Sequence, residues 1–267
     1  MTAAMRIRDA SVVVGLVIVA VACAGPVSPP VRVERPSGDL VVGTSGDSPP
    51  YSTRRAGTIT GLEVDLAIEV GKMLGRHVRI VDVPWDELFD ALGNGRVDVV
   101  MAGVTVTTER ELRFAFAEPY LRTGIAAAVR RENRKRFGSG DAVCKSPIHV
   151  GVISKTTGQR YVRDRCPAII PRIYATADDA VLKLVARRIA AVVHDGPVLA
   201  YLLSQQGAEL DLVPMGITDQ RLAWMVRRDD TALRQTLNDA LANMHRDGTL
   251  DRVLVRWIPQ VERVRSR

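Results

Sequence analysis

Two hydrophobic periodicities alternate along residues 39–103, and turn residues separate them. Short apolar or alternating runs, typical of strands, occupy 39–45, 77–84 and 96–103. Apolar residues fall on one helical face in 62–75, a second helix is expected over 85–95, and both end at a glycine. The order strand, helix, strand, helix, strand predicts a parallel sheet of the α/β class. The polar segment 46–61 is predicted to be a loop.

A second set of elements follows the same plan further along the chain. Strands are expected at 148–155, 169–175, 189–195 and 221–228. Helices are expected at 156–166, 178–188, 197–207 and 231–259, the last broken at Gly248. Two α/β units of similar plan predict a two-lobe molecule. A cleft between lobes is a common place for a small ligand.

Composition changes this picture little. The chain has 267 residues, of which 46% are hydrophobic, enough for a buried core in one or two domains. The formal net charge is +7, but basic residues are scattered apart from one cluster at 130–136. Aromatic residues make up only 4%, and no stacking or zinc motif accompanies them, so we expect no nucleic-acid partner. The charge favours solubility and attraction to an anionic membrane.

The N-terminus predicts export. Arg6 and Arg8 precede an apolar run over 10–22, which is shorter than the ~20 residues that span a bilayer and is typical of a signal peptide. The sequence AVACAG resembles a bacterial lipobox, so 1–22 is interpreted as the signal peptide and Cys23 as a lipidated first residue. The Pro-rich segment 23–37 would be the tether. Ordinary signal cleavage nearby is the alternative, and it also exports the protein.

Two cysteines remain, Cys144 and Cys166. An even number of cysteines in an exported protein favours a disulfide, which here would close a loop of about 22 residues and contribute ~3 kcal/mol. Two free buried thiols are the alternative. No C-x-x-C spacing supports redox or zinc chemistry, and we expect no metal or cofactor.

The stretch AGVTVTTER, 102–110, combines a flexible glycine, small hydroxyls and a guanidinium. Arg110 offers a planar fork that matches a carboxylate, Gly103 allows close approach of the backbone, and Thr105 adds a hydroxyl. The alternative for Arg110 is a solvated arginine at the start of a helix, beside Glu109 and Glu111.

Successive segments of the chain resemble the family 3 extracellular solute-binding proteins, the polar amino-acid receptors of bacterial ABC importers. The segments are GTSGDSPPYS, GLEVDLAIEVGKMLG, VPWDELFDALGNGRVDVVMAGVTVTTERELRFAFAEPY, VGVISKTTG, VVHDGPVLAYL and MHRDGTLDRVLVRWIP. They run in unbroken order over roughly 38–259. The resemblance implies an α/β, two-lobe periplasmic-binding-protein type II fold with a hinge and an interlobe cleft.

The lobes would follow two crossings of the chain, near Leu121–Thr123 and near Pro214–Thr218. Lobe 1 would then comprise 38–122 and 218–262, and lobe 2 would comprise 123–217.

The resemblance also implies roles for individual residues. Gly103, Thr105 and Arg110 would hold the α-carboxylate of the ligand, and Asp195 would accept its α-ammonium group. Thr156 and Thr157, at a helix start, would close over the same carboxylate. Simple N-capping is the alternative for these two threonines and is compatible with that role, and N-capping is also the alternative for Asp195.

The side-chain pocket departs from the family pattern. Ser48 replaces a ring in the run before Tyr51, and Ser45 stands where receptors for cationic amino acids often have an acid. Trp85 would form the remaining wall, with a core position as its alternative. His194 resembles the glutamine-binding members, although a lone histidine is more often structural. We therefore expect a neutral or acidic polar ligand such as glutamine or glutamate.

These residues predict a lipid-anchored receptor on the periplasmic face of the cell membrane, acting as a monomer with an ABC permease and, through it, an ATPase. No nucleophile, P-loop or clustered triad supports catalysis, so no catalytic residue is assigned. One alternative is an enzyme on the same fold that resembles cyclohexadienyl dehydratases. Another is a ligand-sensing lipoprotein with a different membrane partner.

Overall fold

The computed structural model describes residues 38–206, 209–216 and 219–259. The signal peptide, Cys23 and the tether lie outside the described residues, as do 217–218 at one expected crossing and 260–262 at the expected end of lobe 1. No helix within the described ranges is long and apolar enough to cross a bilayer.

The first sheet has five strands in the order β5-β1-β6-β15-β7. Their bounds are Leu40–Thr44 (β1), Val78–Asp82 (β5), Val99–Val100 (β6), Phe114–Phe116 (β7) and Met225–Arg227 (β15). β1 is parallel to β5 and β6, but β15 is antiparallel to β6 and β7. The predicted parallel order is therefore right for the first three strands and wrong for the complete sheet. A C-terminal strand enters between β6 and β7 and makes the sheet mixed.

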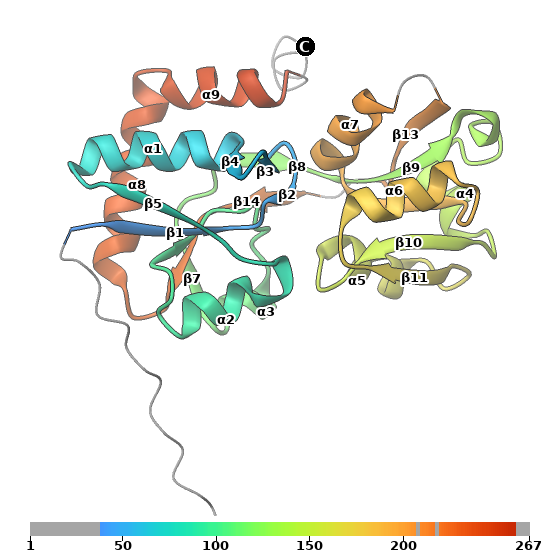
Figure 1. Ribbon diagram of the computed structural model, residues 1–267. Coiled ribbons are helices and arrows are strands. Elements are labelled where there is room, and N and C mark those ends of the chain that lie inside the picture. Colours follow the sequence, from blue (N-terminus) through green and yellow to red (C-terminus); the bar gives the residue numbers. More distant parts are fainter. Residues whose placement is uncertain (1–37, 207–208, 217–218, 260–267) are drawn as a thin grey trace, which may run out of the picture. The chain divides into compact units, whose positions relative to one another are not determined.

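Alternating side chains of β1 face two different layers of helices. Leu40 and Val42 pack against α1 (Leu62–Leu74), α8 (Thr231–Arg246) and α9 (Thr249–Trp257). Val41 faces the opposite side, where α2 (Leu88–Gly93) follows the 3-10 turn η1 (Trp85–Glu87). Figure 1 shows α1 and α9 on one side of β1 and α2 on the other. Apolar residues on both faces of a strand account for its continuous hydrophobic run.

The second sheet has the order β11-β10-β12-β9-β13. Its strands are Ile125–Arg130 (β9), His149–Ile153 (β10), Ile170–Tyr174 (β11), Ala191–Asp195 (β12) and Leu210–Pro214 (β13). Helices α6 (Ala177–Val185) and α7 (Gly196–Gln205) cover one face, and α4 (Gly140–Cys144) and α5 (Thr157–Arg165) cover the other. β10 is parallel to β11 and β12, whereas β9 is antiparallel to β12 and β13, so this sheet is mixed as well.

The predicted strand over 221–228 is in fact two strands. β14 (Gln220–Leu222) pairs with β8 (Leu121–Thr123), and β15 belongs to the first sheet. Ala223 and Trp224 separate them, and the fully buried indole of Trp224 donates a hydrogen bond to Glu63 Oε2 at 3.0 Å. The apolar pattern of the sequence does not reveal this break between the two strands.

The predicted loop over 46–61 contains a small antiparallel sheet. Its strands are Asp47–Ser48 (β2), Ser52–Arg55 (β3) and Thr58–Thr60 (β4). The remaining short elements are α3 (Thr108–Glu111) and the 3-10 turn η2 (Arg131–Asn133). Strands of two to four residues are too short to show a periodicity in the sequence.

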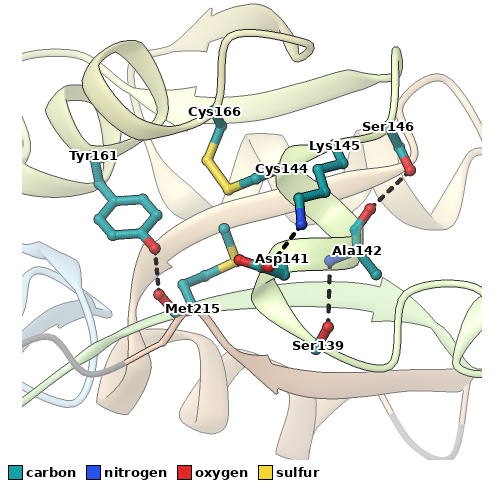
Figure 2. The surroundings of a disulfide bond; sticks show 9 residues. All are labelled: Ser139, Asp141, Ala142, Cys144, Lys145, Ser146, Tyr161, Cys166 and Met215. Atoms are coloured by element: carbon teal, nitrogen blue, oxygen red, sulfur yellow. Dashed lines mark hydrogen bonds and ion pairs between the residues drawn. A yellow bond between two sulfur atoms is a disulfide. The ribbon is translucent and has the colours of Figure 1, made fainter.

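The disulfide between Cys144 and Cys166 is present and joins α4 to the end of α5. Both sulfur-bearing residues are buried in the core that fills one face of the second sheet. Figure 2 shows Tyr161 of α5 donating a hydrogen bond to the carbonyl oxygen of Met215 beside this bridge. The alternative of two free thiols is therefore excluded by the structure.

Candidate functional site

One pocket is lined by residues from both five-stranded sheets and their connections. All of the residues predicted to bind ligand contribute to its wall: Ser48, Tyr51, Trp85, Gly103, Thr105, Arg110, Thr156, Thr157, His194 and Asp195. Asp47, Ala102, Ile153, Ala175, Thr176 and Ala177 complete the lining. The structure thus brings the predicted residues together in one pocket, together with Asp47, which was not predicted.

Arg110 is held in place from several directions. Its backbone N–H donates to Thr107 Oγ1, the cap of α3, at 3.3 Å. Its guanidinium donates to the carbonyl oxygens of Thr105 at 2.8 Å and Lys155 at 3.3 Å, and it stacks 5.5 Å from the centroid of the Trp85 ring. Burial lowers the pKa of Arg110 to about 10, so the side chain remains a cation at neutral pH. Arg110 is thus a partly buried, positioned cation rather than a solvated one.

Asp195 brings a carboxylate into the same pocket. The residue is 8% exposed, and its Oδ1 atom has no hydrogen-bond partner among the described residues. It occupies the N-cap position of α7, yet its side chain makes no capping hydrogen bond. Burial raises the pKa of Asp195, while the nearby His194 and Arg110 oppose that shift. A buried acceptor without a partner is costly in a pure capping role, and a cation in the pocket would satisfy it.

Two further polar groups of the pocket are buried without partners. The Tyr51 hydroxyl and His194 Nδ1 make no hydrogen bond to the described part of the chain. Burial is the main cause that lowers the pKa of His194 and raises that of Tyr51, so both side chains are neutral at pH 7. Trp85 Nε1 is likewise buried and unpartnered. These groups give the pocket several unused donors and acceptors.

Gln220 links Thr105 and Thr157, two of the threonines that line the pocket. Its Nε2 donates to Thr157 Oγ1 at 2.9 Å, and its Oε1 accepts from Thr105 Oγ1 at 3.4 Å. Gln220 lies on β14, the strand that pairs with β8, and is 6% exposed. The sequence analysis missed this residue because a glutamine at a strand start carries no distinctive pattern.

The two threonines at the start of α5 have different surroundings. Thr156 Oγ1 donates to the Ile153 carbonyl at 2.8 Å and accepts from the Gln159 N–H at 3.2 Å, so its hydroxyl caps the helix. Thr157 Oγ1 accepts from Gln220 and lies near Asp195. The capping interpretation of Thr156 therefore agrees with the structure, and Thr157 is the more available of the two.

Gly103 has a positive φ of 64°, and a Cβ at this position would lie 2.4 Å from the Tyr51 ring. Its N–H donates at 2.6 Å to Oε1 of Glu63, a residue 1% exposed. The same carboxylate accepts from the Tyr120 hydroxyl at 2.5 Å. Gly103 thus shapes the wall while its N–H is already engaged. Glu63 was not predicted, because a glutamate in a helix usually faces solvent.

The end of the pocket near β2 is acidic. Asp47 lines it and accepts a hydrogen bond from the Ser45 hydroxyl, while Ser45 itself is fully buried. The sequence analysis took Ser45 as the loss of an acid, but the neighbouring Asp47 supplies one. Across the described residues, no group of histidine, cysteine and carboxylate side chains is arranged to hold a metal ion.

Comparison with known proteins identifies the chain. The family model "Bacterial extracellular solute-binding proteins, family 3" matches residues 40–260. The chain belongs to this family. It is 28% identical over 221 residues to the L-cystine-binding protein TcyJ of Escherichia coli K12, covering 82% of each. It is also 28% identical to the ABC transporter arginine-binding protein 1 of the same strain, covering 82% of this chain and 90% of that one.

A solved structure confirms the fold. The ancestral amino-acid-binding protein AncCDT-1, described as a precursor of cyclohexadienyl dehydratase, superposes with a TM-score of 0.78 at 32% identity. The match covers 82% of this chain and 95% of that one. The predicted type II periplasmic-binding-protein fold is therefore confirmed. These relatives are amino-acid-binding proteins, and the family is extracellular.

Proposed function

We propose that this protein captures a polar α-amino acid in the pocket and delivers it to the permease of an ABC importer. The observation that carries the proposal is the presence in one pocket of Arg110 and of Asp195, whose Oδ1 atom has no hydrogen-bond partner among the described residues. A free α-amino acid carries a carboxylate and an ammonium group, which complement these two charges. Lipid on Cys23 would keep the receptor at the membrane next to its permease.

Binding would couple to closure of two lobes, 38–122 with 218–262 and 123–217. Arg110 belongs to the first and Asp195 and Thr157 to the second, so a ligand held by all three stabilises the closed form. Hydrogen bonds already join the two proposed lobes. The Arg110 guanidinium donates to the Lys155 carbonyl, and the Gln220 amide donates to the Thr157 hydroxyl. The closed form is the state we expect the permease to bind.

Calorimetry with the twenty amino acids tests this function on the full-length protein, purified in detergent and refolded to remove bound ligand. Arg110→Ala should weaken binding of the preferred amino acid at least 100-fold, because charge-assisted bonds to a carboxylate contribute about 1.5–3 kcal/mol each. Arg113→Ala is the matched control, since Arg113 is exposed and pairs with Asp90. An unchanged dissociation constant in Arg110→Ala would show that the carboxylate clamp is wrong.

The same titration distinguishes the role of Asp195. Asp195→Asn should cost affinity for the amino acid while leaving its des-amino analogue nearly unaffected, because only the amino acid presents an ammonium group. Equal affinity of the wild-type protein for both compounds would remove Asp195 from this role.

An enzyme remains the second candidate, favoured by the similarity to AncCDT-1 and by the raised pKa of Asp195, which suits an acid. Incubation with prephenate or arogenate tests it. Formation of an aromatic product would replace the transport function, and its absence alongside tight amino-acid binding would support transport.

A further inference from the structure

Asp47 adds a charge to the pocket that the main chain of an amino acid does not balance. Arg110 and Asp195 already match the α-carboxylate and the α-ammonium group. Asp47 is the third charged residue on the wall, and none of the ion pairs among the described residues involves it. Its recorded partner is the neutral hydroxyl of Ser45. The pocket therefore has one carboxylate left for the ligand's side chain.

The charges of the two pocket aspartates affect the pKa of neighbouring pocket residues. The charge of Asp195 raises the pKa of Arg110, against the larger effect of burial. Both Asp195 and Asp47 oppose the burial that lowers the pKa of His194. Asp47 therefore acts on His194, which lines the same pocket, and it is not among the charges that affect Arg110.

A second carboxylate, Asp178, lies near enough to Asp47 to be affected by its charge, although it does not line the pocket. Asp178 lies in the first turn of α6, which packs against β2. Burial and the charges of Asp179 and Asp47 raise the pKa of Asp178. Like charges repel each other, so a cation bound beside Asp47 would lower this cost even though Asp178 lies outside the pocket lining.

We propose that the pocket selects an amino acid with a cationic side chain, a guanidinium or an ammonium, and that Asp47 is the specificity-determining residue. The inference rests on the proposed function. Asp195, His194 and Tyr51 also line the pocket, and each has a buried polar atom without a hydrogen-bond partner among the described residues. Their exposed fractions are 8%, 6% and 1%. Glutamate, which the sequence favoured, would place a further negative charge beside Asp47.

The test compares arginine with citrulline, its neutral analogue of nearly the same shape, by calorimetry on the full-length protein. We expect the wild-type protein to bind arginine at least 10-fold more tightly than citrulline. Asp47→Asn, which keeps an acceptor for Ser45, should bring that ratio below 3 while changing the citrulline affinity less than 3-fold. Asp178→Asn should lower the ratio by a smaller factor.

Asp90→Asn is the control, because Asp90 is exposed, pairs with Arg113 and does not line the pocket. Thermal unfolding would establish that each variant is folded. Equal affinity for arginine and citrulline, or a ratio unchanged by Asp47→Asn, would overturn the role of Asp47.

The outcomes also separate this inference from the function on which it rests. Tight glutamine binding that depends on Arg110, with no preference for arginine, would keep the receptor function and reject the cationic ligand. Failure of every amino acid to bind would reject both.

Discussion

Glu63 is a buried charge on which one wall of the pocket depends. Its Oε1 accepts from Gly103 N–H and the Tyr120 hydroxyl, and its Oε2 accepts from Trp224 Nε1. Burial is the main cause that raises its pKa, and these hydrogen bonds oppose the shift. One carboxylate thus ties α1 to the turn at Gly103 and to the segment between β14 and β15.

Glu63→Gln tests this network. Gly103 N–H and the Trp224 indole can only donate, so the amide NH₂ of glutamine must face a donor and leave it unsatisfied. We expect the free energy of unfolding to fall by about 1–3 kcal/mol, measured by urea denaturation. Glu69→Gln on the same helix is the control, because Glu69 makes a surface pair with Lys72 worth at most about 0.5 kcal/mol. Equal or greater stability of Glu63→Gln would show that burying the charge costs more than its hydrogen bonds return.

Pocket residues that stand in a distinctive local sequence could be predicted, and buried residues that depend on a distant partner could not. Arg110 and Asp195 stand in segments that carry the family resemblance, and the structure brings both to one pocket. Gln220 forms its hydrogen bond to Thr157 only in the folded chain, where β14 pairs with β8. Glu63 likewise depends on contacts up to 161 positions away. No periodicity in a single sequence encodes such contacts.

At the level of elements, the length of each helix or strand decided how well its bounds could be predicted from the sequence. α1 and α8 have several turns with an apolar face, and their predicted bounds agree closely with the structure. β6 has two residues where a longer strand was predicted, and β14 and β15 were merged into one. Short strands are defined by their pairing partners rather than by their own pattern.

The disulfide is a cross-link between elements, so its removal should act mainly on stability. It joins residues 22 positions apart and ties α4 to α5. We expect Cys144→Ser with Cys166→Ser to lower the free energy of unfolding by about 3 kcal/mol in urea denaturation. Affinity for the ligand should change less than 3-fold, because Thr156 caps α5 through its own hydrogen bonds.

Two comparisons check the disulfide prediction. Adding reductant to the wild-type protein should reproduce the loss, and adding it to the double variant should have no effect. Unaltered stability of the double variant would mean that native packing alone holds these helices together.

At the level of the whole molecule, contacts outside the pocket would contribute to the balance between the proposed open and closed forms. The Arg55 guanidinium donates to the Tyr201 hydroxyl at 2.9 Å, and Lys155 Nζ donates to the Asp86 carbonyl at 3.1 Å. Both contacts are exposed, so each contributes at most about 1 kcal/mol. We infer that the ligand supplies most of the free energy of closure, which makes closure depend on the ligand.

Tyr201→Phe tests this division of roles by removing only the hydroxyl at the contact with Arg55. The apparent affinity should fall by no more than about 5-fold. Loss of the hydrogen bond lowers the fraction of protein in the closed form, and the apparent affinity falls in proportion to that fraction. The ratio of arginine to citrulline affinity should stay constant, since Tyr201 does not line the pocket. Arg54→Ala is the matched control, because Arg54 neighbours Arg55 but pairs with Asp82.

Calorimetry measures both the apparent affinity and the ratio of arginine to citrulline affinity. Small-angle X-ray scattering should show a smaller ligand-induced compaction of Tyr201→Phe at subsaturating ligand. A changed ligand ratio would place Tyr201 in recognition, and tighter binding would show that its contact opposes closure.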